Sequence, residues 1–345
     1  MSRQTIFIAS PLEPVHVDRI RGLDPRRLEV IHDPDILPPI RYVADHIGVP
    51  FRRDAEQAKR WREALAAADI LWDMPRSAED IASAGRLRWV QTTSTGVGQL
   101  VRTLGLEKSD ILITTARSVH AGPLAEFVIM ALLAHWRGLR HLDREQAVHR
   151  WTRYCGHEVA GRTVVLIGAG DLARGVAKVA RALDMRVVAV ARDPGKSRDH
   201  AALFDEIAPR GELHRALARA DAVVVTVPHT PDTERMIDAA AFGAMRKGSA
   251  FVNIARGQVV DEDALIANLH TGHIGFAALD VATVEPLPPE SPLWDMPNVL
   301  ISPHSASTVA SENAKITDIF CHNLAAYLDG RLDEMKNVLN KELMY

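Results

Sequence analysis

The sequence predicts an α/β protein built from two doubly wound parallel sheets. From Gly161 to His304, short apolar runs rich in β-formers alternate with helical patterns, and the first 115 or so residues repeat this more weakly. The runs are apolar throughout, which is typical of strands covered on both faces of a parallel sheet. A length of 345 residues also fits two domains, at roughly 100–200 residues each.

The composition excludes several protein classes. Hydrophobic residues make up 47% and charged residues 25%, as in folded globular proteins. A net charge of −3 gives no basic field for nucleic acid. No apolar run approaches the roughly 20 residues that cross a membrane, and Ile6–Ala9 is too short for a signal segment. Cys155 and Cys321 are too few for a zinc site or disulfide framework, so we expect a cytoplasmic protein without a metal.

The smaller domain begins at the N-terminus. Its expected strands are Thr5–Ser10, Leu28–His32, Ala68–Asp73, Arg88–Thr93 and Ile111–Ala116. A helix then follows over Gly122–Leu139, and because it is apolar nearly all round we expect it to be buried on several sides, as in a subunit interface.

Six strands are expected in the larger domain. They are Thr163–Gly168, Arg186–Ala191, Ala222–Val227, Ala250–Ile254, Ile274–Asp280 and Asn298–Ser302. After the sixth strand, Ile316–Leu328 has helical spacing and Gly330 can end it. This last helix can therefore cross back to the smaller domain.

A glycine-rich loop links the first large-domain strand to a helix. Its residues form the pattern G-x-G-x-x-A: Gly168, Ala169, Gly170, Asp171, Leu172 and Ala173. The first glycine permits a tight turn, the second lets the backbone approach a pyrophosphate, and the third position needs a small residue for packing. The helix N-terminus then presents free N–H groups to the phosphates. Other folds share such loops, but the strand and helix around this one favour a dinucleotide site.

The end of the next strand bears on the choice of cofactor. An NAD site places an acid there, about 20 residues beyond the glycines, whereas this chain has Ala191 followed by Arg192. An arginine can bind a 2′-phosphate, so NADP(H) is favoured over NAD(H). Two alternatives stay open: Arg192 is only a solvated side chain, or Asp193 is the acid, displaced by two positions.

Three reactive side chains follow later strands of the predicted sheet. Arg256, Glu285 and His304 each come after a strand end, where open α/β sheets bind ligands. Any one of them could be a turn or surface residue. Beside a dinucleotide loop, the three form a plausible set for reducing a carbonyl group.

These motifs identify a family resemblance. The order and spacing of Arg256-Gly, Leu279-Asp-Val, Glu285-Pro-Leu and Pro303-His-Ser resemble the D-isomer-specific 2-hydroxyacid dehydrogenases, which include glyoxylate/hydroxypyruvate reductases. The resemblance covers nearly the whole chain. It implies that Arg256, Glu285 and His304 are catalytic. It also implies a Rossmann NAD(P) domain at 117–306, inserted in a flavodoxin-like substrate domain made of 1–116 and 307–345, and a homodimer.

The implied chemistry fits these residues. Hydride passes from the cofactor to C2 of a 2-oxoacid, and His304 supplies the proton that the developing alkoxide needs. Glu285 orients the imidazole and favours its charged form. Arg256 holds the substrate carboxylate and polarises the carbonyl.

The resemblance assigns further binding residues. Backbone N–H groups of Thr95 and Gly96 would bind the substrate carboxylate, although on spacing alone this segment could be only a turn. Residues expected to border the cofactor are Pro228, Thr230, Ile254, Asp280 and Ala306. The chain departs from the family pattern at Ala173, where glycine is usual, and at Ala191, where many members have aspartate.

Three functional hypotheses follow. The leading one is an NADP(H)-preferring reductase that converts a small 2-oxoacid to a D-2-hydroxyacid. The alternatives are an NAD-linked dehydrogenase of a bulkier 2-hydroxyacid and a corepressor-type protein that senses the dinucleotide. Glu285 argues against formate dehydrogenases, which carry Gln there, and the 41 residues after His304 are too few for the regulatory domain of long phosphoglycerate dehydrogenases. Side chains that could line the substrate pocket are Trp72, Met74, His120 and Trp294, although Trp72 and Met74 could equally be core residues.

Overall fold

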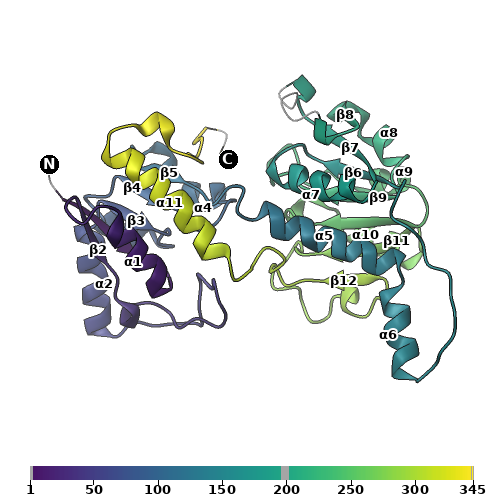
Figure 1. Cartoon of the computed structure of the whole chain (residues 1–345), viewed down its shortest axis with the longest axis horizontal. Helices are drawn as coiled ribbons and strands as arrows, with labels where there is room; N and C mark the ends of the chain where they lie inside the picture. Colours follow the sequence, from purple (N-terminus) through teal and green to yellow (C-terminus); the bar gives the residue numbers. More distant parts are fainter. Residues whose placement is uncertain (1–2, 196–201, 343, 345) are drawn as a thin grey trace. The chain divides into compact units, whose positions relative to one another are not determined.

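The computed structural model describes residues 3–195, 202–342 and 344, and the chain divides into two compact units. Unit 1 comprises Met1–Val119 and Thr308–Tyr345, and unit 2 comprises His120–Ser307. Figure 1 shows both units with their elements labelled. Each unit contains its own parallel sheet, which confirms the predicted fold class.

Unit 1 contains a five-stranded sheet within the described residues, in the order β2-β1-β3-β4-β5. This is the flavodoxin-like order, with the switch point between β1 and β3. Every pairing in it is parallel. The strands are β1 (Gln4–Ile8), β2 (Leu28–Ile31), β3 (Ile70–Trp72), β4 (Trp89–Gln91) and β5 (Leu112–Thr114).

Helices cover both faces of the unit 1 sheet. Phe7 and Leu71 pack with α2 and α4 on one face, whereas Ile6 and Trp72 pack with α1 and α11 on the other. The helices are α1 (Pro14–Leu23), α2 (Ala55–Ala67), α3 (Ala78–Ser83), α4 (Gly98–Thr103) and α11 (Glu312–Leu328). The last helix thus returns the chain to this unit, as its position after the sixth predicted strand suggests.

Unit 2 contains a seven-stranded parallel sheet within its described residues, in the order β12-β11-β10-β9-β6-β7-β8. The reversal of strand order lies between β6 and β9, which is the topological switch point of a Rossmann sheet. The strands are β6 (Thr163–Ile167), β7 (Arg186–Ala191), β8 (Glu206–Pro209), β9 (Ala222–Val225), β10 (Ser249–Asn253), β11 (Ile274–Leu279) and β12 (Val299–Ile301).

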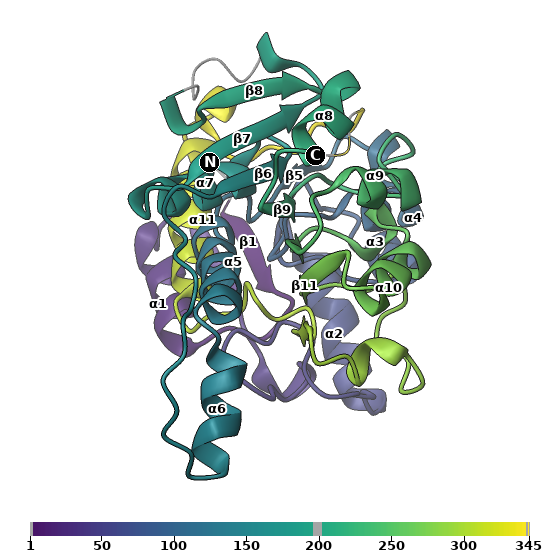
Figure 2. The same ribbon diagram turned by 90° about the vertical axis from the view of Figure 1, so that its right-hand side faces the viewer.

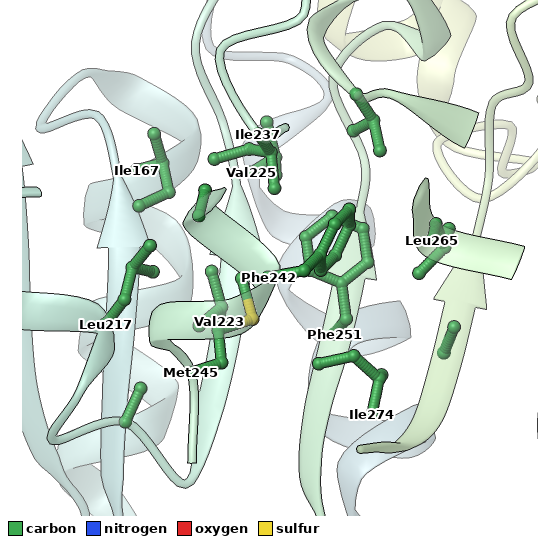
Figure 3. Close-up of a cluster of buried hydrophobic side chains, with 14 of the residues drawn as sticks. Ile167, Leu217, Val223, Val225, Ile237, Phe242, Met245, Phe251, Leu265 and Ile274 are labelled. Carbon is green, nitrogen blue, oxygen red and sulfur yellow. The ribbon is translucent and has the colours of Figure 1, made fainter. Parts of the chain in front are cut away.

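The unit 2 sheet also has two buried faces. Helices α5 and α7 pack against each other and cover one face, and Figure 2 shows α7 beside β6 and β7. Helices α8–α10 cover the other face. There the rings of Phe242 and Phe251 pack edge to face, with 5.2 Å between the ring centroids (Figure 3). The helices are α5 (Ala121–Trp136), α6 (Leu139–Ala147), α7 (Asp171–Ala182), α8 (Leu213–Leu217), α9 (Ala239–Ala244) and α10 (Glu262–His270).

Two elements of unit 2 differ from the sequence prediction. The prediction of six strands is wrong by one, because β8 forms a seventh strand at the sheet edge. Its sequence, Glu206-Ile-Ala-Pro209, is short and contains a proline, which an edge position tolerates. The helix expected over Gly122–Leu139 is confirmed as α5, but it ends earlier, at Trp136; Gly138 adopts a φ of 68°, and a second helix that was not expected, α6, begins at Leu139.

Among the described residues, no helix combines the length and apolar character needed to cross a bilayer.

Candidate active site

The glycine loop lies at the switch point of the unit 2 sheet. Gly168 has a φ of 117°, and a Cβ there would lie 2.7 Å from Thr226 Oγ1, so a side chain would be strained and crowded. A Cβ on Gly170, the residue before α7, would meet no atom within 4 Å. Ala173 is fully buried, as its packing role requires. The loop therefore leaves open backbone at a helix N-terminus, which fits a pyrophosphate.

The chain turns at the end of β7, beside the same loop. Ala191 is the last strand residue, pairs with Pro209 of β8 and is 7% exposed. Arg192 and Asp193 are both exposed. Asp193 Oδ1 accepts a hydrogen bond from the Gly195 N–H at 3.0 Å, so this carboxylate caps its own turn.

The segment after β9 forms a compact turn stabilised by one hydroxyl group. Thr233 Oγ1 donates to the Pro228 carbonyl at 2.7 Å and accepts from the Thr230 N–H at 2.8 Å. Pro228 and Thr230, both expected to border the cofactor, are thereby fixed directly after a strand that adjoins β6.

The turn that carries Arg256 is shaped by Asn253, the last residue of β10. Asn253 is buried; its Oδ1 accepts from the Ala255 N–H at 3.0 Å, and its Nδ2 donates to the Arg256 carbonyl at 3.1 Å. The Arg256 guanidinium donates through Nη1 to the Ala255 carbonyl at 2.6 Å. This short network defines the direction in which the chain leaves the strand.

The Arg256 turn lies directly against the loop after β11. A Cβ built on Gly257 would lie only 1.9 Å from the Ala282 carbonyl oxygen, so no side chain fits there. Next to this contact, Gln258 Nε2 donates to the Thr283 carbonyl at 2.9 Å. The two loops that carry Arg256 and Glu285 are therefore packed backbone to backbone.

Asp280 connects the end of β11 to the segment that carries His304. Its carboxylate is buried, and Oδ1 accepts from Ser302 Oγ at 2.7 Å and from the Ser305 and Ala306 N–H groups at 2.9 Å each. Its backbone carbonyl accepts from the His304 N–H at 2.8 Å. These bonds hold His304 in a left-handed backbone conformation, with a φ of 53°.

His304 and Glu285 form a hydrogen-bonded pair. The distance between His304 Nδ1 and Glu285 Oε2 is 2.7 Å, and the other carboxylate oxygen accepts from the Ala282 N–H at 3.1 Å. Both side chains are partly exposed, at 44% and 38%. Within the described part of the chain, Nε2 of His304 has no hydrogen-bond partner, so it is available to a reacting group.

Arg256 contributes a largely desolvated positive charge to this site. Burial lowers the pKa of its guanidinium below its ordinary value, while the charges of Glu285 and Asp280 oppose that shift. A guanidinium stays protonated under such a shift. The site thus combines a partly buried cation with a paired carboxylate and imidazole at the carboxyl ends of neighbouring strands β10, β11 and β12.

The sequence of the same unit matches a known family. Residues 129–306 fit the family model of the D-isomer-specific 2-hydroxyacid dehydrogenases, in its NAD-binding domain. The chain belongs to this family. It is accordingly an NAD(P)-dependent 2-hydroxyacid dehydrogenase, and the predicted family resemblance is confirmed.

Individual relatives in this dehydrogenase family span most of the chain. It is 34% identical over 226 residues to (S)-sulfolactate dehydrogenase of Chromohalobacter salexigens, covering 65% of this chain and 72% of the relative. It is 29% identical over 295 residues to glyoxylate reductase of Korarchaeum cryptofilum, covering 83% and 86%. The crystal structure of a D-isomer-specific 2-hydroxyacid dehydrogenase from Xanthobacter autotrophicus Py2 in complex with NADPH and MES matches with a TM-score of 0.76 and 25% identity, covering 100% of both chains.

The unit 1 residues that were candidates for substrate binding differ in their exposure to solvent. Thr95 and Gly96 are exposed on the turn that follows β4. Trp72 is fully buried against Phe320 and Met74 is 5% exposed, so the alternative that both are core residues is correct.

The other two candidate pocket residues, Trp294 and His120, belong to unit 2, and neither is fully buried. Trp294 is half-exposed and donates through Nε1 to the Pro288 carbonyl at 2.9 Å. His120 is partly buried directly before α5.

Sequence reasoning did not single out Asn253, Gly257 or Ser302. Each acts through a backbone approach or a hydrogen bond to a residue distant in the sequence, which local patterns do not encode. The only local signal was position, since Asn253 and Ser302 lie within the same strand-end motifs as Arg256 and His304.

Proposed function

We propose that this dehydrogenase reduces a small 2-oxoacid of the glyoxylate or hydroxypyruvate type to the D-2-hydroxyacid, with NADPH as the preferred cofactor. The observation that carries the proposal is the 2.7 Å pair of His304 and Glu285 beside the partly buried charge of Arg256. The similarity to a glyoxylate reductase supports the substrate class.

The loop Gly168–Ala173 and the N-terminus of α7 would hold the cofactor pyrophosphate. Pro228, Thr230, Ile254, Asp280 and Ala306 would border the rest of the cofactor. When bound, the nicotinamide supplies the hydride that reduces C2 of the substrate.

His304 acts as the general acid in this mechanism. Its Nδ1 is engaged by Glu285, so the proton moves from Nε2 to the oxygen on C2 as negative charge develops there. Glu285 fixes the orientation of the ring and offsets the positive charge of the imidazolium. In the oxidative direction the same Nε2 accepts the hydroxyl proton.

Arg256 holds the anionic substrate and stabilises the developing alkoxide. Its planar guanidinium can bind a carboxylate with two parallel hydrogen bonds. Because it is largely desolvated, its electrostatic effect on the carbonyl oxygen is stronger than it would be in water. Backbone N–H groups of Thr95 and Gly96 are proposed as further donors to the substrate carboxylate.

The preference for NADPH is supported by the turn after β7. Ala191 offers no carboxylate to a ribose 2′-hydroxyl, and Asp193 is engaged with the Gly195 N–H. Arg192 follows Ala191 directly and is exposed, so it can approach a 2′-phosphate.

A substrate panel tests this function. Glyoxylate, hydroxypyruvate, pyruvate and phenylpyruvate are each offered with NADPH and with NADH, and the product is resolved by chiral chromatography. The expected result is the highest kcat/KM for glyoxylate or for hydroxypyruvate, in either case with NADPH. The product should be the D isomer wherever it is chiral, and His304→Ala should lose turnover. A preference for phenylpyruvate with NADH, or full turnover in His304→Ala, contradicts the proposal.

We also propose that the enzyme is a homodimer. Helix α6 contains no buried residue, and the chain after it leaves Trp151 98% exposed. A nine-residue helix is marginal in water by itself, so a covering surface is expected, and two-fold pairing of identical chains is the commonest arrangement. Light scattering coupled to size exclusion should give twice the 37.9 kDa chain mass, and Trp151→Ser should lower it at micromolar concentration.

A further inference from the structure

A hollow of about 300 Å³ lies on unit 1, and none of the residues assigned above to catalysis or cofactor binding lines it. It is formed by the segment before α2, by α2 itself and by α3. Three arginines line it, Arg52, Arg53 and Arg62, together with the ring of Trp61. A volume of this size is at the lower end for ligand sites, which suits a small metabolite.

Arg53 is held rigidly in the wall of this hollow. Its guanidinium carbon lies 3.7 Å from the centre of the Trp61 ring, and its Nε donates to the Ile36 carbonyl at 2.8 Å. Trp61 is itself fixed, because its other neighbours are Phe7 at 5.1 Å and Asp80, which accepts from Nε1 at 2.8 Å. The two terminal nitrogens of Arg53 are therefore presented in one orientation.

The charge of Arg53 is not compensated by an ion pair. Burial lowers the pKa of its guanidinium, opposed only by the charge of Asp80. No carboxylate in the described part of the chain lies within ion-pair distance of Arg53. A partly desolvated cation without a counter-ion is costly, and an anionic ligand would relieve that cost.

Arg52 and Arg62 are exposed and likewise have no ion-pair partner among the described residues. Other arginines in this unit are paired with aspartate: Arg19, Arg21, Arg27, Arg41, Arg60 and Arg86. Arg60, two residues from Arg62 on the same helix, pairs with Asp33. Arg26, Arg76, Arg88 and Arg102 also have no ion pair among the described residues of this unit, but Arg52, Arg53 and Arg62 line one hollow together.

We propose that this hollow is a second anion site, which binds the phosphate group of a small metabolite. Three guanidiniums offer more N–H donors than one carboxylate can accept. Their donors suit a phosphate group, which carries more acceptor oxygens and up to two negative charges. Glu79 and Asp80 also line the hollow, so its three guanidiniums outnumber its carboxylates by one. The site is independent of the proposed 2-oxoacid reduction.

The test measures binding of inorganic phosphate by calorimetry at constant ionic strength, with saturating NADPH present so that the cofactor site is filled. Arg62→Gln and Arg52→Gln remove exposed charges and do not endanger the fold, and Arg53→Gln removes the fixed one. Lys59→Gln is the matched control, since Lys59 is an exposed cation on α2 that does not line the hollow. Succinate, a dicarboxylate, is titrated in parallel.

We expect saturable phosphate binding that weakens at least tenfold in Arg53→Gln and at least threefold in Arg52→Gln and in Arg62→Gln, and that stays within twofold in Lys59→Gln. Succinate should bind at least tenfold more weakly than phosphate. The proposal is overturned if phosphate does not bind saturably, if the three arginine variants bind it as the unaltered enzyme does, or if succinate binds more tightly.

Discussion

Ser302 donates its hydroxyl to Oδ1 of Asp280 at 2.7 Å, and this same oxygen accepts two backbone N–H groups of the segment that carries His304. Ser302→Ala should lower kcat about fivefold, because one hydrogen bond of roughly 1 kcal/mol that fixes the segment is lost. Steady-state kinetics measure this. Ser305→Ala is the control, since that hydroxyl reaches only the Pro303 carbonyl, at 3.3 Å, and its kcat should be unchanged.

Gly257→Ala should separate the two catalytic loops. The added Cβ would lie 1.9 Å from the Ala282 oxygen, so the backbone must move and carry Arg256 away from Glu285. We expect a loss of kcat/KM of at least a hundredfold and a lower Tm. Gly243→Ala is the matched control: a Cβ there meets nothing within 4 Å, and Gly243 lies in α9. It should raise the unfolding free energy by about 0.5–1 kcal/mol. Equal activity in both variants would contradict the proposed loop contact.

Glu285→Gln keeps the size of the side chain but removes its charge. His304 would then lose the carboxylate that accepts from its Nδ1. We expect kcat to fall by roughly tenfold to a hundredfold, less than the roughly 10²–10⁴-fold contribution of a general acid, because His304 itself remains. Tm should change little because both side chains are partly exposed. A variant with unaltered kcat would remove Glu285 from the mechanism.

The cofactor preference should respond to two adjacent substitutions. Ala191→Asp combined with Arg192→Ser places a carboxylate at the end of β7 and removes the cation beside it. The ratio of kcat/KM with NADPH to that with NADH should fall at least tenfold, because the carboxylate repels a 2′-phosphate and can bind a 2′-hydroxyl. Arg215→Ser, on α8, removes an exposed arginine elsewhere in unit 2 and should leave the ratio unchanged. An unchanged ratio in the double variant would show that selectivity arises elsewhere.

His135 should make stability depend on pH. It stacks on Phe276 at 4.8 Å, and burial, with smaller contributions from Arg162 and His157, lowers its pKa to about 4 from the ordinary 6.5. The unfolded chain therefore takes up a proton between pH 6.5 and 4 that the folded chain excludes. The stability that this neutral histidine contributes is complete above pH 6.5 and is lost as the pH falls towards 4, by about 2 kcal/mol after allowance for solvent screening.

Denaturant unfolding of His135→Gln and of the unaltered enzyme across this pH range measures the effect. The variant should show a shallower fall in unfolding free energy between pH 6.5 and 4. His270→Gln, which alters an exposed histidine at the end of α10, should retain the original slope. If the unfolding free energy of His135→Gln fell with pH as steeply as that of the unaltered enzyme, burial of His135 would not be the cause of the pH dependence.

Most of the fold was predictable because the strands of a parallel sheet are apolar on both faces. The elements that were missed lack that signal. Strand β8 pairs on one side only and ends in Pro209, and α6 has no buried residue, so hydrophobic periodicity is absent from both. Arg137 and Gly138 separate α5 from α6, and a glycine within an apolar helical pattern does not by itself indicate that the helix ends there.

The sequence could nominate residues for the proposed site only where a motif coincides with reactive chemistry. Arg256, Glu285 and His304 could be named because each follows a strand end and carries reactive chemistry. Trp72 follows the same rule of position, yet its ring lies in the core of unit 1 against Phe320. Which face of a sheet a strand-end side chain occupies depends on packing against a distant helix, and that information is not local in the sequence.

The contact between Gly257 and Ala282 also constrains how this enzyme can acquire new substrates. Because the loops of Arg256 and Glu285 touch through their backbones, neither can lengthen or shift without displacing the other. Insertions that adapt the enzyme to a different 2-hydroxyacid must therefore accumulate in loops outside this pair. The substrate range of the enzyme can thus change through these other loops while the loops of Arg256 and Glu285, and with them the reaction chemistry, stay the same.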